Sequence, residues 1–291
     1  MHLPIALLER KKIQRIIFSV RSSEPQKISL LMEKAYERGG WCFHLPTPLH
    51  LRSFVALRES TGDDFLMGFG QIGAESGVSL TGKPLTHFAS RMVATIAKSL
   101  APPSLVRKFP LEKNGAEVLT PKEVDRMRFD PSLFDQALHP FLRQEIPFLL
   151  IGGPYGDWLL GLGRIDLLRS MVSAIREKGK TPIYQGEWAP FALPKAKPLD
   201  VAAFAIPIHK DEGRLPFEET CKLIKKFERP VLGLRPFSSP PIGRRAEGPF
   251  SLLLKELKVY SLMVEVASER DLDLLFRWAE KVPSLIPFRR T

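Results

Sequence analysis

Two side chains in this sequence are suited to proton transfer, and each follows a short apolar run. His44 comes directly after residues 41–43, and Glu187 comes after residues 181–185 and one glycine. Histidine and glutamate both serve as general acids or bases near neutral pH. We therefore take His44 and Glu187 as catalytic candidates. Two structural alternatives stay open: His44 could be a hydrogen-bonded core residue, and Glu187 could be the structural partner of Arg235.

Basic, amide and hydroxyl side chains follow the other apolar runs. Arg235 stands between residues 230–234 and Pro236, where a guanidinium can grip a carboxylate or a phosphate. His209 and Lys210 could instead be ordinary loop polarity. These residue types predict an anionic small-molecule ligand. The candidate substrate-binding residues are Arg21, Gln71, Gln185, His209, Lys210, Arg235, Ser238 and Ser239.

The sequence shows no metal or nucleotide motif. Cys42 and Cys221 are the two cysteines, and neither stands in a metal-ligand spacing such as Cys-x-x-Cys. We therefore predict no metal site. The segments around Gly68 and Gly152 suit tight strand exits, but they match neither a phosphate-binding loop nor a dinucleotide fingerprint. The sequence does not determine a cofactor.

The net charge raises the question of a nucleic-acid partner. The chain of 291 residues carries 43 Lys+Arg against 32 Asp+Glu, a formal net charge of +11. The basic residues are dispersed, and their densest clusters, at 9–12, 222–226, 243–245 and 289–290, are not interleaved with aromatic side chains. This pattern favours attraction of an anionic substrate over nucleic-acid binding.

The chain has no apolar run near the ~20 residues that a membrane-spanning helix needs. Its apolar residues 3–8 precede Glu9 and the basic residues 10–12, the reverse of a secretory signal, so we expect a cytoplasmic protein. Asn114 is the single asparagine, and depletion of labile amides hints at a heat-adapted source. The oligomeric state is not determined.

Short apolar runs alternate along the chain with amphipathic helical patterns, which indicates a parallel sheet. Residues 73–145 break this rhythm and form an extended irregular excursion, with helices expected at 84–100 and 131–144 and a short strand at 117–119 outside the main sheet. The main strands are expected at 15–21, 41–44, 64–70, 147–153, 181–185, 201–209, 230–234 and 260–266.

These strands number eight, which a (β/α)8 TIM barrel needs, so we predict one such barrel domain over residues 1–291. In these barrels the active site forms at the carboxyl ends of the strands, where the candidate residues above stand. The alternative is an open doubly wound sheet. Against it, Arg21-Ser22-Ser23 follows the first strand in place of a glycine-rich fingerprint.

The order of segments resembles the aldo-keto reductase superfamily. The resemblance rests on residues 8–17, 34–39, 229–237 and 264–268, where Val264-Glu265-Val266-Ala267-Ser268 is similar to the family's last strand leading into its final helix. It covers both ends of the chain better than the middle. The resemblance implies a TIM barrel and an NADPH-dependent carbonyl reductase.

The catalytic residues of that family have no counterparts here. The resemblance places His44 at the family's acidic position, Leu49 at its tyrosine and Gly70 or Gln71 at its lysine. Gly152 falls at its histidine, and residues 274–275, both leucine, fall where the adenosine end of NADPH is held. Because the proton donor and its tuning groups are missing together, we expect this chain to share the family's fold without its redox activity.

Three hypotheses about function remain. The first is a non-redox small-molecule enzyme of lyase, isomerase or hydrolase type that acts on an anionic substrate. The second is an NADPH-dependent oxidoreductase with a rearranged site. The third is a non-catalytic barrel that binds a ligand or partner, in which case residues 73–145 would carry a wide apolar patch.

Overall fold

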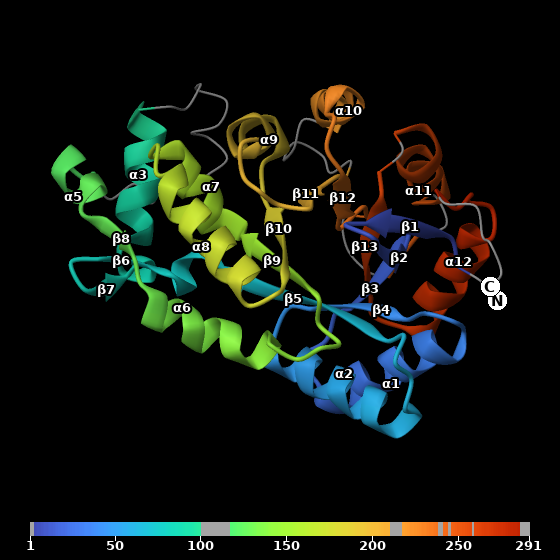
Figure 1. Cartoon of the computed structure of the whole chain (residues 1–291). Helices are drawn as coiled ribbons and strands as arrows, with labels where there is room; N and C mark the ends of the chain where they lie inside the picture. Colours follow the sequence, from blue (N-terminus) through green and yellow to red (C-terminus); the bar gives the residue numbers. More distant parts are fainter. Residues whose placement is uncertain are drawn as a thin grey trace.

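A computed structural model describes residues 3–99, 117–209, 217–237, 241–243, 246–257 and 259–285. Its centre is a closed barrel of eight parallel strands (Figure 1). Around the ring, neighbouring strands follow one another in chain order, and the last pairs with the first. The strands are β3 (Ile16–Val20), β4 (Cys42–Leu45), β5 (Met67–Gly73), β9 (Phe148–Gly152), β10 (Thr181–Gln185), β11 (Ala203–Pro207), β12 (Val231–Leu234) and β13 (Ser261–Val266). The predicted fold is therefore confirmed.

Helices follow the strands and cover the outside of the barrel, as the alternating pattern predicts (Figure 1). Their apolar faces pack on the outward-facing strand residues, which form one continuous outer core. The helices are α1 (Pro25–Glu37), α2 (Pro48–Thr61), α7 (Gly153–Gly161), α8 (Ile165–Glu177), α9 (Ala189–Ala196), α10 (Phe217–Lys226), α11 (Glu247–Ser251), a π-helical turn at Leu252–Glu256, and α12 (Glu269–Ala279).

A second, smaller core fills the barrel itself. Side chains of a strand point alternately inward and outward, so every second residue reaches this core. Its centre is a stacked aromatic pair, Phe69 and Phe148, whose ring centroids are 4.8 Å apart. The inward-facing apolar residues are Ile17, Cys42, Phe69, Phe148, Leu150, Ile183, Ala203, Ala205, Leu232, Leu234 and Met263.

A hairpin that the sequence patterns did not predict closes the amino-terminal end of the barrel. Strands β1 (Ile5–Leu8) and β2 (Lys11–Gln14) pair antiparallel, and one residue separates β2 from β3. Ala6, Leu8 and Ile13 pack against the inner core. The floor of the barrel is thus sealed with apolar side chains, and only its carboxyl end remains to hold a polar site.

The excursion between β5 and β9 is more regular than expected in the part that the structure describes. It forms an antiparallel sheet of three short strands, β6 (Val78–Leu80), β7 (Lys83–Pro84) and β8 (Met127–Phe129). The helical segments of the excursion are η1 (Ala74–Ser76), η2 (Leu85–Phe88), α3 (Ala89–Ser99), α5 (Pro121–Asp125), α6 (Pro131–Leu138) and η3 (His139–Phe141). Helix α7 packs against η1 and α3.

Two sequence expectations about elements need correction. Residues 117–119 were expected to form a strand, but they are irregular and lead into α5, whose first turn is capped by Thr120 and Glu123. The third barrel strand was expected at 64–70 and lies at Met67–Gly73. Asp63 accepts a hydrogen bond from the Phe65 backbone, so a turn occupies the start of the expected strand.

Candidate functional site

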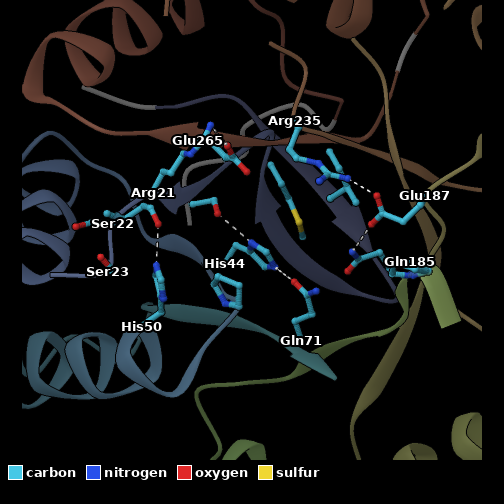
Figure 2. A pocket seen from close by; sticks show the side chains of 16 residues that line it. Arg21, Ser22, Ser23, His44, His50, Gln71, Gln185, Glu187, Arg235 and Glu265 are labelled. Atoms are coloured by element: carbon cyan, nitrogen blue, oxygen red, sulfur yellow. Dashed lines mark hydrogen bonds and ion pairs between the residues drawn. The ribbon is translucent and has the colours of Figure 1, made fainter. Parts of the chain in front are cut away.

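The last inward-facing positions of several strands are polar. Ser19, His44, Gln71 and Gln185 stand two residues after Ile17, Cys42, Phe69 and Ile183, which belong to the inner core. The strand period of two therefore carries these polar side chains inward, just above the apolar layer. They surround a cavity of about 490 Å³ at the carboxyl ends of the strands (Figure 2).

His44 lies in this cavity between two hydrogen-bond partners. Its Nδ1 is 3.0 Å from the Ser19 hydroxyl, and its Nε2 is 2.9 Å from the Gln71 side-chain carbonyl oxygen (Figure 2). A carbonyl oxygen only accepts, so in the neutral ring Nε2 carries the proton and Nδ1 accepts from Ser19. The two neighbours therefore set both the orientation and the tautomer of the imidazole.

The environment keeps this ring uncharged. Burial lowers the pKa of His44 from 6.5 to about 4, against the hydrogen bond with Gln71, which raises it. Charge interactions with His50 and Arg235 lower the pKa of His44 further. His44 is consequently a neutral acceptor and donor at physiological pH, rather than a cation that would pair with an anionic ligand.

An ion pair occupies the opposite wall. The Arg235 guanidinium contacts Glu187 Oε2, and Gln185 Nε2 donates to Glu187 Oε1 at 3.1 Å (Figure 2). Arg235 has a φ of 45°, a left-handed conformation that is costly for a residue with a side chain. The fold thus holds this arginine in a strained turn directly after β12, where its side chain reaches the carboxylate.

A buried carboxylate supports the loop that carries Glu187. Asp157 on α7 accepts from the Tyr184 hydroxyl at 2.7 Å and from the backbone N–H groups of Glu187 and Trp188 at 2.9 and 3.0 Å. Burial raises the pKa of Asp157 to about 7, although these three donors act in the opposite direction. Asp157 therefore fixes the backbone of the loop after β10 and, with it, the position of Glu187.

The remaining wall is formed by the turn after β3. Arg21 lies 3.5 Å from Glu265 Oε2 across neighbouring strand ends, and Ser22 and Ser23 line the cavity beside it. His50 on α2 bonds the Val20 carbonyl oxygen at 2.7 Å through Nε2, which ties α2 to the end of β3. Two cations and two carboxylates therefore face the cavity, with each arginine already beside an acid.

The structure brings most of the sequence candidates together. Residues Arg21, His44, Gln71, Gln185, Glu187 and Arg235 all line this cavity. His209 follows β11 and is not among the lining residues, while Lys210, Ser238 and Ser239 lie outside the described residues. The catalytic and binding roles assigned to these residues stay predictions.

Ser19, His50 and Glu265 line the cavity and were missed from the sequence. Ser19 stands inside the apolar run of β3, where a small polar residue is unremarkable, and Glu265 sits in the last barrel strand. Alternation along each strand was the available signal, because it places Ser19 on the face of Ile17. His50 lies in the first turn of α2 and gave no comparable signal.

No group of three or more His, Cys, Asp or Glu side chains in the described part of the chain could hold a metal ion. No described helix is both long and apolar enough to cross a membrane.

No protein-family model and no curated protein matches this sequence. Solved structures do match in three dimensions. An aldo-keto reductase from Bacillus halodurans has a TM-score of 0.56 at 10% identity, covering 97% of this chain and 92% of its own. The fold is that of the aldo-keto reductases.

Two other solved structures agree. A proposed aldo-keto reductase from Pseudomonas aeruginosa has a TM-score of 0.56 at 10% identity, covering 95% of this chain and 94% of that one. A thermostable aldo-keto reductase bound to the inhibitor epalrestat has a TM-score of 0.53 at 9% identity, with 96% and 94% covered. At these identities the similarity establishes the fold alone, so the chemistry must be argued from the cavity.

The cavity differs from the reductase pattern that the sequence resemblance implies. Leu49, at the position given to the family's tyrosine, packs against the outer core rather than lining the cavity. Neither tyrosine nor lysine occurs among the described residues that line it. His44 and Gln71, at two other positions of the pattern, bond to each other instead.

Proposed function

We propose that this protein is a non-redox small-molecule enzyme of hydrolase, lyase or isomerase type that acts on an anionic substrate. The observation that carries the proposal is a neutral, oriented His44 at the base of a cavity whose opposite wall holds the Glu187 carboxylate. An uncharged imidazole and a carboxylate on facing walls are a pair of groups that can move protons on a substrate between them.

The two arginines support the substrate class. Each guanidinium has five N–H donors, more than its neighbouring carboxylate can accept. Arg21 and Arg235 can therefore share a substrate carboxylate or phosphate while keeping Glu265 and Glu187 beside them. The formal net charge of +11 adds a long-range attraction for such anions.

Binding of inorganic phosphate and citrate, measured by calorimetry, tests the substrate class. We expect binding by the native protein and at least a tenfold loss in Arg235→Gln, because a charged donor to the anion is removed. Arg52→Gln is the matched control, since Arg52 is exposed on α2 and does not line the cavity. Equal binding by both variants would place the anion elsewhere and contradict the proposal.

The shared fold favours one alternative, an NADPH-dependent oxidoreductase with a rearranged site. Titration with NADPH and NADH, followed by nucleotide fluorescence, separates the two functions. Micromolar binding would support the reductase and require another proton donor in place of Leu49. We expect no binding at millimolar nucleotide.

A further inference from the structure

Ser19, His44 and Gln71 form a chain of hydrogen bonds in which Ser19 is the end that carries a hydroxyl. Its hydroxyl oxygen lies 3.0 Å from His44 Nδ1, and the residue lines the cavity although it is only 7% exposed. Both ring nitrogens of His44 are engaged, Nε2 with Gln71 and Nδ1 with Ser19. His44 can therefore act on a substrate most directly through the Ser19 hydroxyl.

The direction of these hydrogen bonds matches an activated nucleophile. The Gln71 carbonyl oxygen accepts the Nε2 proton, so the lone pair of Nδ1 faces the Ser19 O–H. A hydroxyl, a neutral imidazole and a group that orients the imidazole are the parts that nucleophilic catalysis by serine requires. An amide orients the imidazole in the Cys-His-Asn sets of papain-like proteases, and here the Gln71 carbonyl oxygen fixes the tautomer by accepting from Nε2.

We propose that Ser19 is the nucleophile of an acyl-transfer reaction, with His44 as its general base and Gln71 as the residue that positions the imidazole. This inference rests on the proposed function and narrows it to hydrolysis of a small ester or thioester. Ser19 Oγ would touch the reacting carbon, whereas Gln71 acts through His44.

The proposed reaction balances without any added cofactor. Ser19 Oγ forms a bond to the acyl carbon while its proton passes to His44 Nδ1. The carbon–leaving-group bond then breaks, and the leaving group takes that proton from Nδ1. Water attacks the resulting Ser19 ester with His44 again as base, which releases the acid and restores the hydroxyl. The net change is the addition of one water across the ester or thioester bond.

A charged donor for the developing oxyanion is present in the same cavity. The Arg235 guanidinium lines the cavity and lies close enough for its charge to lower the pKa of His44. A guanidinium stabilises the negative oxygen that forms when a hydroxyl attacks a carbonyl group.

The test is covalent labelling of the full-length protein with phenylmethanesulfonyl fluoride and, separately, with 4-nitrophenyl acetate. Both fit a cavity of about 490 Å³. With the sulfonyl fluoride, a bond from Oγ to sulfur replaces the S–F bond, fluoride leaves and the proton goes to His44. Intact-mass spectrometry and peptide mapping should find one adduct, on Ser19, and none in Ser19→Ala.

Variants and pH separate an activated serine from a merely accessible one. We expect the labelling rate to fall on the order of 100-fold in His44→Ala and His44→Gln, since a general base contributes at least that much. It should fall about tenfold in Gln71→Leu, where the tautomer is no longer fixed. Ser170→Ala, at a half-buried serine on α8 that does not line the cavity, should label like the native protein.

The pH profile gives an independent readout. Because the pKa of His44 is about 4, the labelling rate should hold from pH 8 to pH 5 and decline only below that. A decline with the same midpoint in His44→Gln would show that the base is another group and would overturn the assignment.

Two results would overturn the assignment of Ser19 as the nucleophile. One is the absence of a Ser19 adduct with both reagents in protein that still binds phosphate; the other is equal labelling of the native protein and both His44 variants. Either would leave the anion-binding enzyme proposal standing. That proposal would fail on different results: no phosphate binding by the native protein, or micromolar binding of NADPH.

Discussion

At the scale of single residues, His44 is controlled by its surroundings more than by its own chemistry. Burial among barrel side chains disfavours the imidazolium, while Ser19 and Gln71 satisfy both nitrogens of the neutral ring. A buried polar group with complete hydrogen bonding is stable where a charged one is not. The cavity therefore offers a histidine whose protonation state is constant over the physiological range.

The lowered pKa of His44 makes the free energy of unfolding decrease as the pH falls. The pKa of His44 is about 4 in the folded protein against 6.5 as its ordinary value, so the unfolded chain takes up the proton first as pH falls. The contribution of His44 to the free energy of unfolding is fully present above pH 6.5 and is lost as the pH falls toward 4. Between pH 6.5 and pH 5 we expect a loss of about 2 kcal/mol.

Urea unfolding of the native protein and His44→Gln at both pH values measures that loss. Asp157 contributes with the opposite sign, because its raised pKa favours proton uptake by the folded state, but it is present in both proteins. The difference between the two proteins therefore isolates His44. An NMR titration of His44 with a midpoint near 6.5 would contradict the prediction.

Asp157 gives a second residue-scale prediction. Asp157→Ala removes the group that accepts three hydrogen bonds, so the backbone N–H groups of Glu187 and Trp188 lose their partner. We expect a loss of about 1–3 kcal/mol in urea unfolding and faster hydrogen exchange at the Glu187 and Trp188 amides.

Tyr184→Phe is the matched control for Asp157. It removes only the contact at 2.7 Å, so it should cost about 1 kcal/mol and leave exchange at residues 187–188 unchanged. Unchanged exchange in Asp157→Ala would show that the carboxylate does not hold the loop.

At the scale of elements, the amino-terminal hairpin decides that only one end of the barrel is open. Ile13 is fully buried against the inner core, whereas Leu7 on the same hairpin is 45% exposed. Ile13→Ala should lower the free energy of unfolding by about 2–4 kcal/mol through lost burial and a residual cavity. Leu7→Ala should change it by less than about 0.5 kcal/mol. Equal urea midpoints for the two variants would show that the hairpin does not seal the floor.

At the scale of the whole molecule, Arg15 joins the two ends of the chain. It is fully buried between β2 and β3, and its guanidinium donates to the backbone carbonyl oxygens of Leu254, Val259, Tyr260 and Pro283. Burial lowers its pKa to about 10. These bonds hold the segments before β13 and after α12 against the start of β3, where the barrel closes.

Arg15→Lys should therefore cost about 2–4 kcal/mol of unfolding free energy, although it keeps the charge. An ammonium on a flexible stem cannot replace the planar fork that reaches four carbonyl oxygens, and those left unpaired are buried. Arg52→Lys, at an exposed site, is the control in urea unfolding. A loss below 1 kcal/mol for Arg15→Lys would show that water or other donors satisfy these groups.

Local sequence patterns predicted most of the barrel strands. The apolar run 148–151 lies in β9, because a buried parallel strand favours a continuous apolar stretch, and residues 181–185 coincide with β10. The excursion was predicted because strand and helix patterns stop alternating there. Its strands were not predicted, because they are only two or three residues long and too short to show a hydrophobic alternation. The hairpin at 5–14 was missed since each of its strands spans only four residues.

The sequence by itself determined the alternation of strands and helices, and hence which side chains stand at the carboxyl ends of strands, because hydrophobic periodicity is a local property. Tertiary structure alone decided which of these side chains meet. Ser19 reaches His44 because β3 pairs with β4, and Arg235 reaches Glu187 across β11, which lies between β10 and β12 in the barrel. Those contacts join residues 25 and 48 positions apart, and no local pattern encodes such a separation.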